Sequence, residues 1–114
     1  MAYTREPLSG STHGRGIKIA ATATAGTTIH TGQASTTLVD VVTLYAYNSD
    51  TVTRRLTLEW GGVTSPDDHL VFDIPPKSTV LIVSDLVIRN SLVVRGFADA
   101  ANVVMVNGFI NIEA

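Results

Sequence analysis

Histidine is the residue type in this chain best suited to acid–base or metal chemistry, and it occurs at positions 13, 30 and 69. No two of these histidines stand at the short spacing that presents two imidazoles to one metal ion. The best local cluster is Asp67-Asp68-His69, which places two carboxylates beside an imidazole. It follows Ser65-Pro66, a turn signal that is typical of a solvated loop tip. We therefore expect no metal site and no cofactor.

Nucleophilic and phosphate-binding motifs are also missing from the sequence. The chain has no cysteine and no Gly-x-Ser-x-Gly segment that would expose a reactive serine. Gly14-Arg15-Gly16 lacks the longer glycine spacing and the following helix of a phosphate-binding loop. Arg54 and Arg55 point to opposite faces of a predicted strand, which favours two separate ion pairs over one anion site. We assign no catalytic residue and expect that the protein is not an enzyme.

Aromatic side chains raise the possibility of a sugar-stacking surface. Only 6% of the residues are aromatic, and the notable ones are Trp60, Tyr45 and Tyr47. We expect Trp60 to pack in the core and the two tyrosines to pack in the core or in an interface.

Composition narrows the classes of partner. The 114-residue chain is long enough for one core, and only 16% of its residues are charged, with a net charge of −2. That charge would not hold a polyanion, so we expect no nucleic-acid partner. No stretch approaches eighteen apolar residues and the start lacks the apolar segment of a signal peptide, so we expect no membrane partner. Abundant Thr and Val favour strands over helices.

From Ile17 to the end, apolar and polar residues alternate with period two, and turn signals recur about every ten residues. We predict one antiparallel β-sandwich domain over residues 17–114, all-β and jelly-roll-like, with about eight strands. Residues 17–31 and 92–112 are each predicted to form a local hairpin. In the strand that ends at Trp60, the face that carries Thr57 and Glu59 is predicted to be the outer one. The long, apolar final strand needs cover on both faces, which indicates oligomerisation.

The first sixteen residues differ from the rest. They contain one proline and three glycines among Ser and Thr, and their only sizeable apolar side chains are Tyr3 and Leu8. Such a segment buries too little surface to offset its ordering entropy. We therefore predict a flexible, extended N-terminal arm over residues 1–16, which is either a frayed terminus or a docking arm.

Several segments of the chain resemble a family of small tailed-bacteriophage virion proteins. The resemblance covers most of the chain and rests on "YTREPLSGSTHGRGIKIAATATAGTTIHT", "LYAYNSD", "LTLEWGG", "PDDHL" and "LVVRGFADAANVVMVNGFIN". These proteins look like capsid decoration, or cement, proteins, which bind the outer face of the head, often as trimers, and reinforce contacts between capsomers. The resemblance implies the major capsid protein as partner, a homo-oligomer (a trimer), synthesis in the bacterial cytoplasm and a final location on the virion surface. Under it, the expected capsid-binding residues of the arm are Tyr3, Arg5, Leu8 and Arg15.

Two other readings remain open. The alternative structural role is a neck, tail or baseplate component of the same kind of particle, since such components also use β-sandwich domains, and copy number per virion would distinguish it. A carbohydrate-binding module is a third possibility, and it predicts a row of exposed aromatic side chains.

Overall fold

The computed structural model describes residues 2–114, whose regular elements are all strands. They form two antiparallel sheets around one hydrophobic core, so the prediction of an all-β fold is confirmed. Sheet A has the order β1-β9-β4-β7, with β2 also paired to β9, and sheet B has the order β3-β8-β5-β6. The nine strands are β1 Tyr3–Pro7, β2 Ile17–Lys18, β3 Thr27–Thr31, β4 Asp40–Asn48, β5 Arg54–Trp60, β6 His69–Ile74, β7 Ser78–Ile88, β8 Val93–Ala98 and β9 Val104–Glu113.

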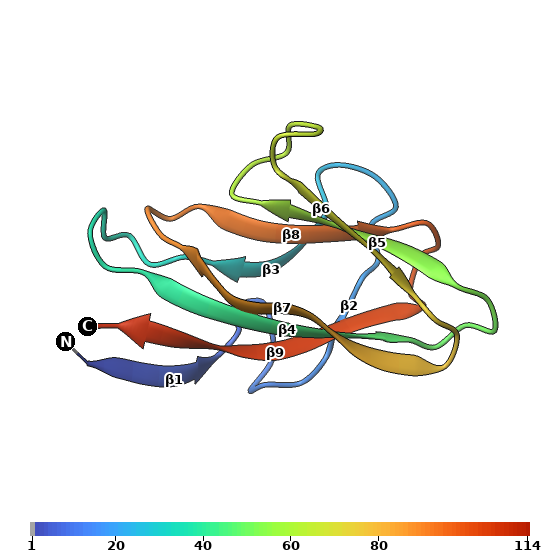
Figure 1. Ribbon diagram of the computed structural model, residues 1–114, viewed down its shortest axis with the longest axis horizontal. Helices are drawn as coiled ribbons and strands as arrows, with labels where there is room; N and C mark the ends of the chain where they lie inside the picture. Colours follow the sequence, from blue (N-terminus) through green and yellow to red (C-terminus); the bar gives the residue numbers. More distant parts are fainter. Residues whose placement is uncertain (1) are drawn as a thin grey trace.

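The strand pairs are nested. β5 pairs with β6, β4 with β7, β3 with β8 and β2 with β9. The strands of the first half of the chain therefore pair, in reverse order, with those of the second half. The pairs alternate between the two sheets, and further pairings of β4 with β9 and of β5 with β8 complete each sheet. In Figure 1, β1, β9 and β4 lie side by side, and the two chain ends meet at the left.

Both predicted local hairpins are wrong. In residues 17–31, β2 belongs to sheet A and β3 to sheet B. In residues 92–112, β8 belongs to sheet B and β9 to sheet A. Between β2 and β3 the chain crosses from sheet A to sheet B. In this connecting loop, the carbonyl of Ala21 accepts a hydrogen bond from the backbone N–H of Ala98. Alternation of apolar and polar residues indicates which side of a strand faces the core, but not which strand it pairs with. It therefore could not show that the two strands of each predicted hairpin belong to different sheets.

The first part of the predicted N-terminal arm, up to Gly10, is attached to the two sheets, and residues 12–16 form an exposed loop. β1 adds a strand to β9, with Tyr3 opposite Glu113 and Pro7 opposite Phe109. Leu8 then enters the core and is 1% exposed. Every residue of β1 is exposed, and Leu8 is the side chain of this segment that enters the core. Burial patterning had no means of detecting a strand whose own side chains stay outside.

In the central strands, one set of alternating apolar residues faces the core. In β4, Val42, Leu44 and Ala46 are fully buried, and in β5 so are Leu56 and Leu58. The described chain contains no helix with the length and apolar character of a membrane span.

Candidate interaction surface

The outer face of sheet A carries two exposed tyrosines of β4. On β4, Tyr45 and Tyr47 alternate with buried residues and are 38% and 36% exposed. Leu81 lies opposite Tyr45 on β7 and is 54% exposed. The register places these side chains on one side of the sheet. We define the outer face of sheet A by seven residues of four strands, namely Arg5, Tyr45, Tyr47, Leu81, Met105, Asn107 and Phe109.

The β9 side of this face continues the same surface. Met105 lies opposite Tyr47 and Asn107 opposite Tyr45. Met105 and Phe109 are half-buried. Large side chains therefore extend across β7, β4 and β9, and no element of the described chain covers them.

Two of the predicted arm residues lie at the margin of this face. The guanidinium of Arg5 stacks over Phe109 at 4.3 Å from the ring centroid, and its Nε donates to Asn111 Oδ1 at 3.2 Å. Tyr3 lines a shallow pocket of about 360 Å³ together with Val41 and Asn111. Arg5 is thus held on the sheet by its own neighbours, with an aromatic ring beneath it.

The other two predicted residues lie elsewhere. Leu8 is buried in the core, so its side chain is not available as an anchor, and this part of the arm prediction is corrected. Arg15 is exposed in the loop between β1 and β2, where it lines a small polar pocket with Lys18. Lys18 is paired with Met105, so Arg5 and Lys18 place two positive charges at the β1–β2 margin of the outer face.

Sheet B presents a different outer face, because the chain itself covers part of it. Thr57 and Glu59, predicted to be on the outer side, are 7% and 0% exposed. Thr24 donates its hydroxyl hydrogen to Glu59 Oε2, and Gly26 donates its backbone N–H to Glu59 Oε1 at 2.6 Å. The prediction that this side of β5 is open is therefore wrong, since the loop between β2 and β3 covers it and places donors against the buried carboxylate.

Ion pairs occupy the more exposed positions of β5, and the prediction that Arg54 and Arg55 form separate pairs is confirmed. Arg54 contacts Asp50 at 2.7 Å, and Arg55 contacts Asp73 on β6 at 2.9 Å. The hydrogen bond from Arg55 holds the pKa of the Asp73 carboxyl below its usual range. Arg54 does the same for the pKa of Asp50, with a further backbone bond from Thr51.

A buried polar network was not predicted from the sequence. His30 Nε2 lies 2.7 Å from Asp40 Oδ2, and both side chains are buried. Ser9 donates its backbone N–H to His30 Nδ1, so Nδ1 is an acceptor and the hydrogen is on Nε2. Gln33 also donates to Asp40. This network joins the N-terminal segment to β3 and β4, and no local spacing of His30 and Asp40 indicates it.

The other histidines and the Asp67-Asp68-His69 cluster do not come together in one site. His13 is exposed in the loop between β1 and β2, and His69 Nε2 is 4.0 Å from Glu59 Oε2. Asp68 Oδ2 accepts a hydrogen bond from the backbone of Thr64, inside its own loop. Within residues 2–114, no three His, Asp or Glu side chains gather as metal ligands do.

Comparisons of the chain with models of protein families, with curated proteins and with solved structures find no match.

Proposed function

We propose that this protein is a structural component of a tailed-phage virion, a decoration protein that binds the outer surface of the head and reinforces contacts between capsomers. The observation that supports a docking role is the outer face of sheet A, where exposed tyrosines and a 54%-exposed leucine stand together without cover from the described chain. The phage assignment rests on the resemblance of the sequence. The major capsid protein is the proposed partner, and no catalytic role is part of the proposal.

The chemistry of the outer face suits a protein partner. Tyrosine and arginine contribute the most binding energy per side chain at interfaces, and this face has Tyr45, Tyr47 and Arg5 around an aliphatic Leu81. Arg5 and Lys18 make its β1–β2 margin positive, so carboxylates are the complementary groups on the capsid side. Tyr3 and Arg15 keep their proposed roles as peripheral contacts, whereas Leu8 acts through the stability of β1.

The nested strand pairs support the finer fold assignment that we propose, a jelly-roll sandwich. In such a fold one long antiparallel hairpin is rolled up so that its successive pairs alternate between two sheets. The pairs β2–β9, β3–β8, β4–β7 and β5–β6 follow that scheme. We also propose a homo-oligomer, as a trimer, because several weak contacts to the shell bind tightly when they act together.

Binding to heads that lack the protein tests the proposed role with a matched pair of variants. Leu81→Ser removes an exposed aliphatic side chain from sheet A, and Val71→Ser removes one that is 52% exposed from β6 of sheet B. We expect Leu81→Ser to weaken cosedimentation with heads about tenfold and Val71→Ser to leave it unchanged. Equal binding of both variants and the wild type would show that the outer face of sheet A is not the docking surface.

The location of the protein in an electron-microscopy map of the virion separates the structural alternatives. Density on the shell at high copy number supports a decoration protein. Density at the neck, tail or baseplate would contradict the decoration role and support a role as a component of that part of the virion.

The aromatic outer face also favours a second candidate function, carbohydrate binding. Tyr45 and Tyr47 are exposed two residues apart on one strand face, about 7 Å from each other along the strand. Sugar rings stack on such side chains. Titration of oligosaccharides against the wild type and Tyr45→Ala, followed by NMR, tests this function, and it fails if no resonance of the outer face shifts.

A further inference from the structure

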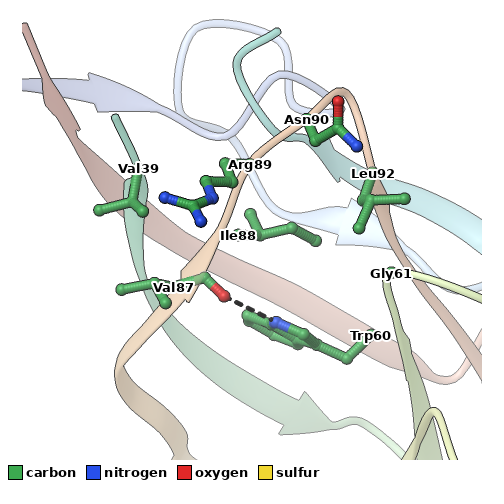
Figure 2. Close-up of a pocket in the computed structure, with 8 residues that line it drawn as sticks. All are labelled: Val39, Trp60, Gly61, Val87, Ile88, Arg89, Asn90 and Leu92. Carbon is green, nitrogen blue, oxygen red and sulfur yellow. Dashed lines mark hydrogen bonds between the residues drawn. The ribbon is translucent and has the colours of Figure 1, made fainter. Parts of the chain in front are cut away.

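A groove of about 540 Å³ lies where β5 ends and β7 turns into β8. Figure 2 shows the Trp60 ring on one side of it and Ile88 in the middle, with Leu92 to one side of Ile88 and the Arg89 guanidinium next to Val39 on the other. Its volume falls within the range of about 300–1,000 Å³ in which proteins bind small groups.

The walls of the groove are held in place by hydrogen bonds. Trp60 Nε1 donates to the carbonyl of Val87 at 3.1 Å, which fixes the indole plane (Figure 2). The turn Arg89–Leu92 is closed by a bond from Leu92 N–H to the Arg89 carbonyl at 3.2 Å. Asn90, in the left-handed region with φ 61°, donates its N–H to Ser35. A group that enters the groove therefore meets walls that need little reordering.

The polar groups of the groove indicate what it would recognise. Arg89 donates one hydrogen bond, from Nη1 to the carbonyl of Thr37 at 3.2 Å, and forms no ion pair within residues 2–114. A guanidinium has five N–H donors in a planar fork that matches a carboxylate. The Asn90 carboxamide adds a donor and an acceptor, the two functions that a peptide bond complements.

We propose that this groove binds a segment of a partner polypeptide in which an apolar side chain lies next to a carboxylate. The apolar side chain packs against Trp60 and Leu92, and the carboxylate pairs with Arg89. Asn90 favours a polypeptide over a free fatty acid, because it can bond to the backbone beside the apolar side chain. This proposal does not depend on the decoration role.

Titration with small probes tests the groove directly, since Trp60 is the only tryptophan in the chain and its fluorescence reports occupancy. N-acetyl-leucine and N-acetyl-leucinamide have the same shape and differ in the carboxylate. We expect millimolar binding of both, with N-acetyl-leucine about fivefold tighter at low salt. Hexanoate, which has the carboxylate but no peptide group, should bind more weakly than N-acetyl-leucine.

Variants assign the effect to the named residues. Arg89→Gln should abolish the preference for N-acetyl-leucine over its amide, and Arg95→Gln, which removes the same charge from β8, should retain it. The Trp60 indole N–H resonance provides a second readout. The proposal is overturned if N-acetyl-leucine leaves both signals unchanged, if Arg89→Gln keeps the preference, or if hexanoate binds as tightly as N-acetyl-leucine.

Discussion

Leu8 changes the interpretation of the N-terminal segment more than any other residue. In the sequence it follows Pro7 in a stretch of polar residues, and the resemblance to virion proteins implies that it is a capsid-binding residue. In the structure its side chain is part of the core, beside residues of both sheets. A large apolar side chain enclosed in this way is removed from water by folding and contributes to the stability of the chain itself.

Leu8→Ala is therefore expected to destabilise the protein by about 2–5 kcal/mol, the range for deleting a buried leucine side chain. Urea unfolding followed by Trp60 fluorescence measures this loss. Leu92→Ala is the control, since Leu92 is 46% exposed and should cost about 1 kcal/mol or less. Equal midpoints for the two variants would contradict the placement of Leu8 in the core.

Asp73 gives a prediction about pH. Its folded pKa is lowered, chiefly by the hydrogen bond from Arg55, so the pair stabilises the fold above the ordinary carboxyl pKa. That contribution is lost as the pH falls through the lowered folded value. An NMR titration of the Asp73 carboxyl should show its pKa rising toward the ordinary value in Arg55→Gln. Because both side chains are well exposed, added salt should weaken the shift in the wild type. An unchanged titration in the variant would mean that Arg55 is not the cause.

At the scale of elements, β1 and the residues after it connect the two sheets. β1 lies on the edge of sheet A, and two residues past Leu8 the backbone N–H of Gly10 donates to the carbonyl of Ile29 in β3 at 2.9 Å. Ser9 contacts β3 as well, through the side chain of His30. The segment predicted to be an independent arm therefore belongs to the edges of both sheets.

Gly10 permits this close approach, and its replacement provides a test. A Cβ atom at Gly10 would lie 2.5 Å from the Ile29 carbonyl oxygen, so the backbone would have to move apart. Gly10→Ala should cost about 1–3 kcal/mol in thermal or urea unfolding. Gly16→Ala serves as control, because a Cβ there meets Met105 at 3.8 Å, an ordinary contact. Tolerance of both alanines would argue against the attachment of this segment to β3.

At the scale of the whole molecule, the two outer faces differ. Sheet A presents tyrosines and aliphatic side chains, whereas sheet B presents ion pairs and is partly covered by the loop between β2 and β3. The pairing of β1 with β9 also brings the two chain ends together, with Ala114 N–H donating to the Ala2 carbonyl at 2.9 Å. Joining the two ends would therefore need only a short linker.

A circular permutant tests this arrangement. Its old ends are joined by a short Gly/Ser linker and its new ends lie between Ala100 and Ala101, in the loop between β8 and β9. We expect a folded protein with the same far-UV circular dichroism, because the cut interrupts no strand and makes the β9–β1 pair local. A permutant opened between Leu44 and Tyr45, inside β4, should fail to fold. The same outcome for both cuts would contradict the observed topology.

Much of the secondary structure follows from the residues alone. The period-two alternation from Ile17 predicted strands in the region of β4 to β9. Asn48 and Pro75, residue types that favour turns and end strands, stand at the ends of β4 and β6. The separate ion pairs of Arg54 and Arg55 were also predictable, since adjacent residues of a strand face opposite sides. These features depend on each residue and its near neighbours.

The candidate interaction surface was only partly predictable. Tyr3, Arg5, Tyr45 and Tyr47 were singled out for their residue types, but that Arg5 lies over Phe109, more than a hundred positions away, depends on the pairing of β1 with β9. Leu81 and the groove beside Trp60 carry no local signal at all. Leu81 lies beside Tyr45 only because β7 pairs with β4, and the groove forms only because the end of β5 lies against the end of β7.

The sequence by itself therefore determined that the chain is all-β and that the alternating apolar residues of β5, Leu56 and Leu58, face the core, because alternation at period two is a local property. The tertiary structure decided that β1 joins sheet A and that Leu8 and Gly10 attach the following segment to the core and to β3. It also decided that the predicted hairpins are split between the two sheets and that Glu59 and His30 are enclosed. The physical reason is that a strand satisfies its backbone hydrogen bonds with any edge of the right register. Which edge it joins is decided by the packing of the whole chain.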